Sequence, residues 1–405
     1  MNLDARELAA TFDLERLTPE FYANPYRTYR ALRETEPVKR LPNGSYFLTR
    51  YDDLVAAYKN TKAFSSDKKK EFSPKYGASL LYEHHTTSLV FNDPPAHTRV
   101  RRLIMGALSP RAIAGMEPDL IRLVDRLLDA IAAKDKVDLI DDFAAAIPIE
   151  VIGNLLDVPE GEREPLRDWS LAILGALEPV PGDERLHAGN RAVDEFKEYL
   201  RRLIADRRRR PSQDPGEILS ALIAAEDRGD GLTELELLHQ CIFLLNAGHE
   251  TTTNLIANAV QSLLEHPKEL ARLHAEPRLI GSAVEEFLRF QSPNQLGNRS
   301  VATGAEVGGV HLPPGTLVTL GIGAANRDPA HFPDPDRLDL GRAPNRHLAF
   351  ITGIHACAGM WLARMEGRVA IARLAARFPG VRAAGPAVRG RRARFRTLVS
   401  LPVTL

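Results

Sequence analysis

The sequence predicts a mainly helical protein with a minor β region. Thr233 and Glu236 form a capping box that opens a helical stretch running to Glu265, about 32 residues and roughly 48 Å. Apolar residues recur at helical spacing along most of the chain. Strand-like runs broken by glycine and proline are confined to short segments. These observations favour helices packed around one long buried helix.

The N-terminal part combines helices with a hairpin. Residues 21–36 carry apolar positions at helical spacing and predict a first helix. Residues 38–51 alternate around a Pro-Asn-Gly turn, which predicts a β-hairpin. A short helix is expected over 53–60. Residues 68–88 show no period and predict a long, mobile loop, a kind of segment that often serves as a lid.

The rest of the chain is predicted to be helical, with strands near its C-terminal end. An Asn-Asp-Pro-Pro cap at 92–95 starts a helix that carries His97 and Arg101. Glycine and proline punctuate short strands over 305–320, and the tail from 388 to 405 is strand-like. The remaining helices are expected over residues 117–132, 141–156, 160–177, 184–210, 267–275, 279–290 and 358–378.

Composition limits the class of protein. The 405 residues include 53 basic and 53 acidic side chains, so no global charge points to nucleic acid or to a membrane surface. Cys241 and Cys357 are the two cysteines, which excludes a disulfide framework and fits a reducing cytoplasm. The first 25 residues resemble neither a signal peptide nor a membrane anchor. We expect one domain over residues 1–405, cytoplasmic, soluble and monomeric.

Cys357 lies in the most informative stretch. The preceding loop contains Gly353 and His355, and a helix begins close behind the cysteine. Free N–H groups and the helix dipole at that position favour a thiolate over a thiol. Most lone cysteines in intracellular proteins are small buried apolar residues. The pattern here instead indicates a metal ligand or a nucleophile.

The long central helix interrupts its apolar character at residues 246–253. Polar side chains in a buried helix are costly unless they are satisfied. Gly248 weakens the helix, and the Thr251 hydroxyl can bond back to a carbonyl and bend it. A bent turn beside the Glu250 carboxyl suits a small ligand and a proton relay. A purely structural kink is the alternative.

Two motifs together resemble a known family. Phe350, Gly353, His355, Cys357 and Gly359 stand at the spacing of the haem-thiolate loop of the cytochrome P450 monooxygenases. The run from Ala247 to Thr252 is similar to the family's oxygen-activation motif. The resemblance covers the chain from Pro25 onward and implies the cytochrome P450 fold, a triangular prism with the long helix over the haem. Ile351 departs from the family's usual glycine or serine, so we expect the loop to pack differently and less water to reach the pocket around the Cys357 sulfur.

The resemblance also implies a set of cofactor contacts. Cys357 would ligate the iron of haem b, held without thioether links. Glu286, Arg289 and Arg342 would form the family's structural salt-bridge core. Four donors for the two haem propionates would be His97, Arg101, Arg299 and His355.

The same resemblance implies a reaction. Ala247 and Gly248 would leave room for O2, Thr251 would hydrogen-bond the oxygen, and Glu250 would feed protons through water. The result is oxygen insertion into a C–H bond of a small organic substrate. Electrons would come from a ferredoxin and its reductase. We expect a basic patch with little acid nearby on the final helix and tail, suited to an acidic ferredoxin: Arg364, Arg368, Arg373, Arg377 and Arg382.

The substrate is the least determined part of the prediction. The expected pocket residues are Asn246, His249, Gln295, Leu296 and Ile322, roofed by residues 68–90 and 165–185. A mostly apolar molecule with one or more polar handles would suit them. Two alternatives stay open: a peroxide-driven haem peroxygenase, which would not need the Glu250 and Thr251 relay, and a non-catalytic haem protein that senses a ligand.

Overall fold

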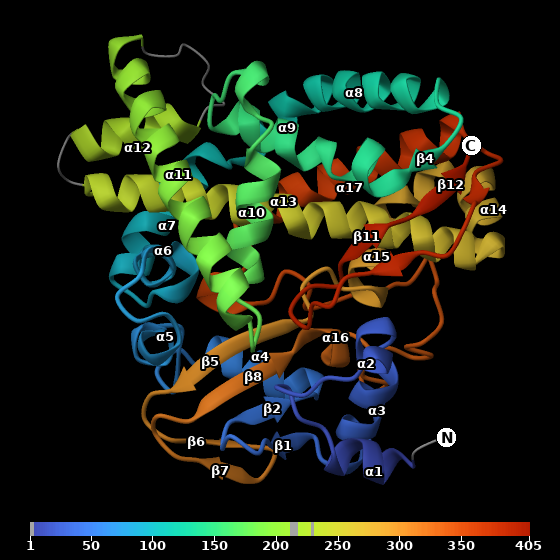
Figure 1. Cartoon of the computed structure of the whole chain (residues 1–405). Coiled ribbons are helices and arrows are strands. Elements are labelled where there is room, and N and C mark those ends of the chain that lie inside the picture. Colours follow the sequence, from blue (N-terminus) through green and yellow to red (C-terminus); the bar gives the residue numbers. More distant parts are fainter. Residues whose placement is uncertain (1–3, 211–217, 228–230) are drawn as a thin grey trace.

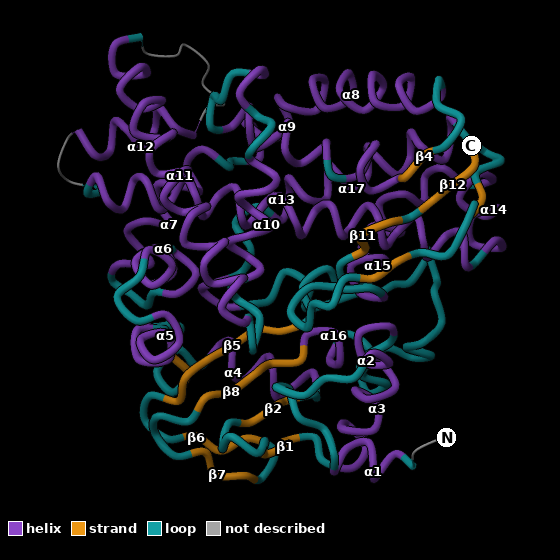
Figure 2. The backbone as a smooth tube through the Cα atoms, in the orientation of Figure 1, coloured by secondary structure: helices purple, strands orange, loops and turns teal. Residues whose placement is uncertain are grey.

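The computed structural model describes residues 4–210, 218–227 and 231–405. Helices make up most of this part of the chain, and the strands gather mainly at one end (Figures 1 and 2). Within the described residues, none of the helices combines the length and the apolar character needed to cross a bilayer.

In the described part of the chain, twelve α-helices precede the longest one. They are α1 Ala5–Ala10, α2 Pro19–Ala23, α3 Tyr26–Thr35, α4 Tyr51–Lys59, α5 Lys69–Tyr76, α6 Leu80–Thr87, α7 Ala96–Ala107, α8 Pro110–Ala132, α9 Ala146–Leu155, α10 Leu166–Gly175, α11 Gly182–Arg209 and α12 Ile218–Asp227. The later helices are α13 Glu234–Glu265, α14 Pro267–Ala275, α15 Ile280–Phe290, α16 Ile322–Ala325 and α17 Met360–Arg377.

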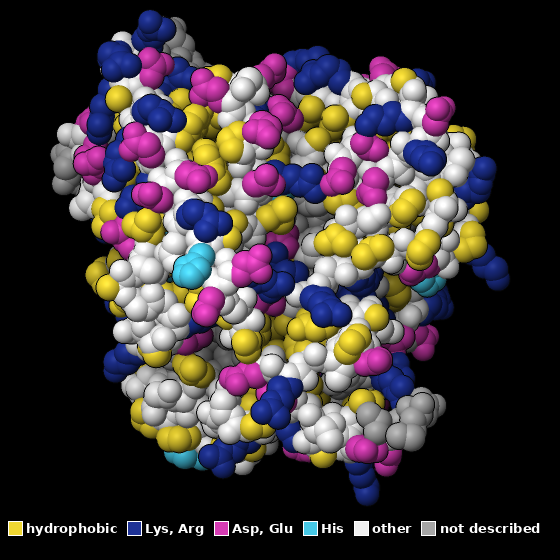
Figure 3. Space-filling view, viewed as in Figure 1, with side chains coloured by type: hydrophobic (Ala, Val, Ile, Leu, Met, Phe, Trp, Pro, Cys, Tyr) yellow, Lys and Arg dark blue, Asp and Glu magenta, His cyan; other side chains and the backbone are white. Residues whose placement is uncertain are grey.

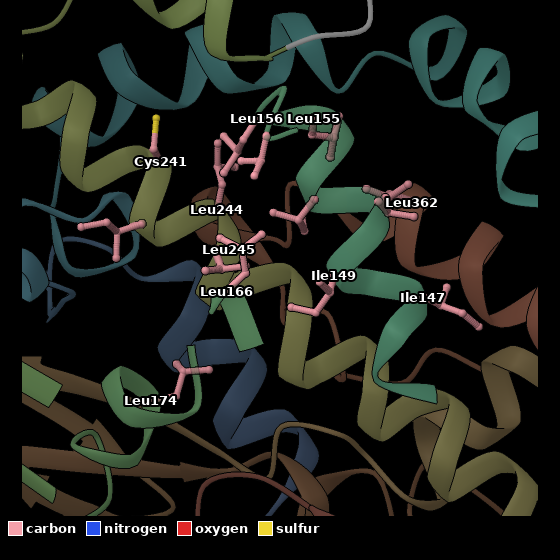
Figure 4. Close-up of a cluster of buried hydrophobic side chains, with 14 of the residues drawn as sticks. Ile147, Ile149, Leu155, Leu156, Leu166, Leu174, Cys241, Leu244, Leu245 and Leu362 are labelled. Carbon is pink, nitrogen blue, oxygen red and sulfur yellow. The ribbon is translucent and has the colours of Figure 1, made fainter. Parts of the chain in front are cut away.

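Helix α13 is the centre of the helical part. The predicted capping box is confirmed, since the Glu236 backbone N–H binds the Thr233 hydroxyl and the Glu236 carboxylate binds the Thr233 N–H. The helix is 32 residues long and packs against α9, α10, α11, α15 and α17. Figure 4 shows apolar side chains of α9, α10, α13 and α17 meeting in one cluster. This contact explains why α13 is apolar on most sides.

The largest sheet has five strands in the order β1-β2-β8-β5-β3. The predicted hairpin is confirmed as β1 Val38–Arg40 paired with β2 Tyr46–Leu48. β2 runs parallel to β8 Leu317–Gly321, which pairs antiparallel with β5 Leu296–Val301. The other strands are β3 Phe64–Ser65, β4 Val137–Asp138, β6 Ala305–Val307, β7 Val310–Leu312, β9 Arg382–Ala383, β10 Val388–Arg389, β11 Leu398–Ser400 and β12 Pro402–Thr404.

Two predictions near the N-terminus are wrong. The expected loop over residues 68–88 contains α5 and α6, because Phe72 and Leu81 are buried in the core and the Ser79 hydroxyl caps α6. The expected single helix over residues 21–36 is divided into α2 and α3. Asn24 has an extended backbone there, and its side chain accepts the Tyr26 N–H. In the first case core packing stabilises helices that have no apolar period, and in the second a local side-chain hydrogen bond interrupts a predicted helix.

A buried charge cluster joins α15 to the segment that precedes the Cys357 loop. Arg289 donates two hydrogen bonds to Glu286, each 2.8 Å long, and both side chains are fully buried. Arg342 also binds the Glu286 carboxylate, at 3.1 Å. Arg289 further donates to the backbone oxygens of Asn326 and Pro335. The cluster therefore fixes the irregular chain from 326 to 345 against the helices, as the resemblance implied.

Four of the five arginines in the predicted patch, those on α17, form ion pairs. Arg368, Arg373 and Arg377 form ion pairs with acidic side chains of α8, at 2.8, 2.5 and 3.3 Å. Arg364 is paired with Glu285 at 2.6 Å. The expectation of few acidic neighbours is therefore wrong, because it considered only residues close in sequence. Basic and acidic side chains are also interspersed on the face shown in Figure 3.

Candidate functional site

A cavity of about 340 Å³ separates α13 from the loop that carries Cys357. Residues of α6 and the 88–91 turn, of α9 and α10, of α13, and of the start of β5 form its wall. Both segments expected to roof the pocket reach the cavity, since Lys68, Leu89, Leu174 and Leu177 are among the lining residues. Leu155, Leu174, Leu244 and Leu362 belong both to the cavity wall and to the cluster of Figure 4. The cavity is thus a gap within the main hydrophobic core.

The loop before α17 holds Cys357 at the cavity wall. The Cys357 N–H donates to the Phe350 carbonyl at 3.0 Å, which closes the loop. Gly353 has φ +79°, and a Cβ there would meet the Tyr58 carbonyl oxygen at 2.5 Å, so only glycine fits. Ile351 has φ +50°, a conformation that β-branched residues rarely adopt. A glycine, which together with serine is usual at this position in the family that the sequence resembles, would adopt this positive φ without strain.

The surroundings of the Cys357 thiol differ from the expectation. Burial raises the pKa of the thiol, against the opposing effects of the Gly359 N–H and the Arg101 and Arg364 guanidinium groups. The loop alone therefore favours the neutral thiol over the predicted thiolate. A metal cation would reverse this preference, because coordinated thiols lose their proton. No group of three or more His, Cys, Asp or Glu side chains in the described ranges could hold a metal ion. A metal bound by Cys357 would need a cofactor for its other ligands.

Four cationic or neutral donors converge beside the loop, and none of them forms an ion pair with an acidic side chain of the described residues. The rings of His97 and His355 lie 4.1 Å apart, and Arg101 and Arg299 also border the cavity. Burial and then the nearby Arg299 lower the pKa of His355 to about 3. Both ring nitrogens of His97 and Nε2 of His355 are buried and find no partner in the described part of the chain. Unpaired buried donors are costly, so the site suits a ligand with carboxylates, such as the two haem propionates.

Helix α13 presents the small residues of the predicted oxygen groove to the cavity. Ala247, Gly248 and Thr251 line it, as does Thr252. The Thr251 hydroxyl donates to the Ala247 carbonyl at 2.8 Å, the predicted bond back to the helix. A Cβ on Gly248 would meet the Ile152 side chain at 2.6 Å. The helix is assigned without interruption through this turn, so the groove results from small side chains.

Glu250 lies on the side of α13 that faces away from the cavity. Its carboxylate accepts hydrogen bonds from Arg392 at 3.0 Å and from the Thr397 hydroxyl at 2.9 Å. Arg392 also donates to Glu178, at 3.0 Å. Burial raises the pKa of Glu250, and the charge of Arg392 and the Thr397 hydroxyl oppose this effect. Sequence spacing could not identify these partners, because they lie 142 and 147 residues away along the chain.

The structure corrects three of the five pocket residues. Asn246 and Leu296 line the cavity as expected. His249, Gln295 and Ile322 lie outside its wall. His249 projects from another face of α13 and is buried, the Gln295 amide donates to the Ser292 carbonyl at 2.7 Å, and Ile322 packs in the core beside the five-stranded sheet. Gly353 and His97 do not line the cavity either. Gly353 shapes the Cys357 loop, and His97 belongs to the cationic cluster of His97, Arg101, Arg299 and His355.

Several lining residues were not singled out from the sequence. Tyr58 stacks against the Arg299 guanidinium, 4.9 Å from the ring centre. His84 and His85 on α6 are both buried at the roof. Glu366 on α17 borders the cavity with 3% of its surface exposed, and its Oε2 has no hydrogen-bond partner in the described chain. Neither the spacing of apolar residues nor the sequence motifs could identify these lining residues, because tertiary packing places each of them at the cavity.

Comparison with known proteins gives a consistent result. The sequence model of the family described as Cytochrome P450 matches residues 177–379. The biotin biosynthesis cytochrome P450 of Bacillus subtilis is 38% identical, over 95% of this chain and 97% of that protein. The vitamin D(3) 25-hydroxylase of Pseudonocardia autotrophica is 39% identical, over 89% and 87%.

Solved structures agree with the sequence relatives. The crystal structure of P450BioI in complex with an acyl carrier protein that carries hexadec-9Z-enoic acid superposes with a TM-score of 0.90. It is 37% identical and covers 96% of this chain and 100% of that one. The fold class expected from the resemblance is therefore correct. Together with the Cys357 loop, the groove in α13 and the buried Glu286 cluster, these matches show that the chain belongs to the cytochrome P450 family of monooxygenases.

Proposed function

We propose that this chain is a haem-thiolate monooxygenase that hydroxylates a small, mostly apolar organic molecule. The observation that carries the proposal is one cavity that brings together Cys357, the α13 groove and the unsatisfied cationic cluster. Cys357 would hold the iron of haem b, and His97, Arg101, Arg299 and His355 would hold its carboxylates. When bound, the haem supplies the iron that activates O2.

The residues of the chain would orient the reactants and supply protons. Ala247 and Gly248 leave space at the cavity wall, and the Thr251 hydroxyl lies beside that space. Glu250 is screened from the cavity, and burial keeps its pKa raised, so it can hold a proton behind the groove. The Thr251 hydroxyl, which bonds the Ala247 carbonyl, can rotate toward the cavity and would donate a hydrogen bond there. These two side chains support the relay, which would require water between them.

Substrate and partners follow from the lining and from the relatives. Leucine, isoleucine and phenylalanine side chains dominate the cavity wall, which fits a mostly apolar substrate. The named relatives act in biotin biosynthesis and on vitamin D(3), and one solved relative carries a fatty acyl group on a carrier protein. Electrons would come from a ferredoxin and its reductase, as the family resemblance implies. We further propose that residues 1–405 form one monomeric domain.

The carbon monoxide difference spectrum of the reduced protein tests this assignment. We expect the long-wavelength band typical of thiolate ligation, and its loss in Cys357→Ala. Cys241→Ala is the matched control, because Cys241 is buried in α13 away from the cavity. If Cys357→Ala leaves the spectrum unchanged, Cys357 is not the iron ligand and the assignment is refuted. Product formed with hydrogen peroxide alone, and none with ferredoxin and its reductase, would support a peroxygenase instead.

A further inference from the structure

A chain of buried polar side chains connects the protein surface to the cavity. Glu83 on α6 lies near the surface and is paired with Lys197 of α11. Its Oε1 is 2.9 Å from Nε2 of His239. Nδ1 of His239 is 3.3 Å from Nδ1 of His84, and Nε2 of His84 is 3.3 Å from Nδ2 of Asn246. None of these contacts belongs to the haem-binding loop or to the α13 groove.

The two histidines in this chain are neutral, so each donates through one nitrogen and accepts through the other. Burial lowers the pKa of His239 to about 4, and burial lowers the pKa of His84 well below its usual value. Burial raises the pKa of Glu83, but the hydrogen bonds from Lys197 and His239 outweigh it and lower the pKa overall. Glu83 is therefore an ionised acceptor at neutral pH.

The ionised carboxylate sets the direction of every hydrogen bond that follows. Because Glu83 can only accept, His239 must carry its proton on Nε2, and its Nδ1 is an acceptor. His84 then donates from Nδ1 and accepts at Nε2. Asn246 must donate its amide N–H to that Nε2, so its carbonyl oxygen is the end left over. The opposite direction would place a lone pair of His239 against the Glu83 carboxylate at 2.9 Å.

The remaining oxygen of Asn246 requires a donor. Asn246 is 5% exposed and forms part of the cavity wall, and its Oδ1 has no hydrogen-bond partner in the described part of the chain. A ligand that leaves a buried acceptor unsatisfied binds roughly 5- to 100-fold more weakly than a ligand whose donor satisfies it. Ala247 and Gly248 follow directly in sequence, so this oxygen lies next to the proposed reaction site.

We propose that Asn246, oriented by His84, His239 and Glu83, selects substrates that carry a hydroxyl or an amide N–H near the carbon to be oxidised. This inference rests on the proposed function for the identity of the cavity. It assigns Asn246 as a specificity-determining residue and the other three side chains as positioning residues. An ether or a tertiary amide of the same size would leave Oδ1 unsatisfied and would bind less tightly.

The test compares matched ligand pairs by isothermal titration calorimetry on the holoprotein. The probes are two isomeric pairs: 1-decanol with 1-methoxynonane, and N-ethyldecanamide with N,N-dimethyldecanamide. In the parent protein we expect the donor of each pair to bind roughly 5- to 100-fold more tightly. Asn246→Leu should bring both ratios near one. Asn254→Leu should leave them unchanged, because Asn254 is a buried asparagine of the same helix that does not line the cavity.

Two further variants test the orientation. Glu83→Gln removes the fixed acceptor, so both directions of the chain become allowed and the ratios should fall. Lys197→Met removes the ion pair but keeps the carboxylate, so the ratios should persist. Parent ratios near one, or a full preference retained in Asn246→Leu or in Glu83→Gln, would overturn the inference. Calorimetry does not depend on the iron ligand, so a failed carbon monoxide spectrum with intact ratios would refute only the proposed function.

Nitrogen NMR of His84 and His239 tests the direction of the hydrogen-bond chain without any substrate probe. In protein labelled with ¹⁵N-histidine and held in the diamagnetic ferrous carbon monoxide form, ring-nitrogen shifts separate protonated from bare nitrogens. We expect protonated Nε2 in His239 and protonated Nδ1 in His84. The reverse pair of tautomers would show that Asn246 presents its amide N–H, and the inference would be wrong.

Discussion

Glu366 makes the stability of this protein depend on pH in a predictable direction. The carboxyl group is buried on α17, and burial raises its pKa from 4.5 to about 8. A group whose pKa is raised in the folded state stabilises the fold below its unfolded pKa, and this contribution is lost as pH rises through the folded pKa. Between pH 4.5 and 8 the folded chain therefore holds a proton that the unfolded chain releases.

The expected magnitude follows from the proton balance. One proton of difference changes the free energy of unfolding by about 1.4 kcal/mol per pH unit, so about 2.7 kcal/mol is lost between pH 5.5 and 7.5. Glu366→Gln keeps the shape of the side chain and cannot ionise. The stability of this variant relative to the parent should therefore rise by about that amount over the same interval.

Urea unfolding at four pH values, followed by the fluorescence of Trp169 and Trp361, measures this difference. Glu164→Gln is the control, since Glu164 is exposed and its substitution should leave a constant difference across the range. The reasoning is refuted if the stability difference between Glu366→Gln and the parent does not change with pH. That result would mean that Glu366 ionises near its ordinary pKa, with water or a donor beside Oε2.

Three other predictions follow from the site and its support. Glu286→Gln should lower the free energy of unfolding by about 3–5 kcal/mol, because Arg289 would keep a buried charge without its carboxylate. A double-mutant cycle of Glu286→Gln with Arg289→Met, measured by urea unfolding, should show strong non-additivity. Gly353→Ala should destabilise the protein by about 2–4 kcal/mol and reduce haem content, since the φ is unfavourable and the new methyl group would meet the Tyr58 carbonyl; normal haem absorbance and an unchanged unfolding midpoint would contradict this. Thr251→Ala should keep the thiolate-type spectrum but divert reducing equivalents to hydrogen peroxide, and equal coupling of NADH consumption to product in parent and variant would exclude the relay.

The parts of the fold that the sequence predicted depend on local signals. The capping box at Thr233 and the Pro267 stop define α13 within the chain itself, so its length was predictable. β5 was missed because Gly297 and the polar Asn298 and Arg299 interrupt any apolar alternation. It forms a strand because β8 and β3 pair with it on both sides.

The candidate site divides in the same way. Cys357 and Thr251 were identified because each stands in a motif of fixed spacing. The partners of Glu250 could not be identified, because Arg392 and Thr397 reach it from the C-terminal segment. Gln295 was assigned to the pocket by position, yet its amide turns toward Ser292 instead. Side-chain direction depends on packing that no sequence period encodes.

The carboxylate of Glu178 links two parts of the molecule that have different tasks. It follows α10 directly, beside roof residue Leu177, and it binds both Arg392 and the Ala393 N–H, at 3.0 and 2.7 Å. Arg392 in turn holds Glu250. A displacement of Glu178 would therefore act on the guanidinium that stabilises the negative form of Glu250. A displacement that drew Arg392 away from Glu250 would raise the pKa of that carboxyl and make it a weaker acid.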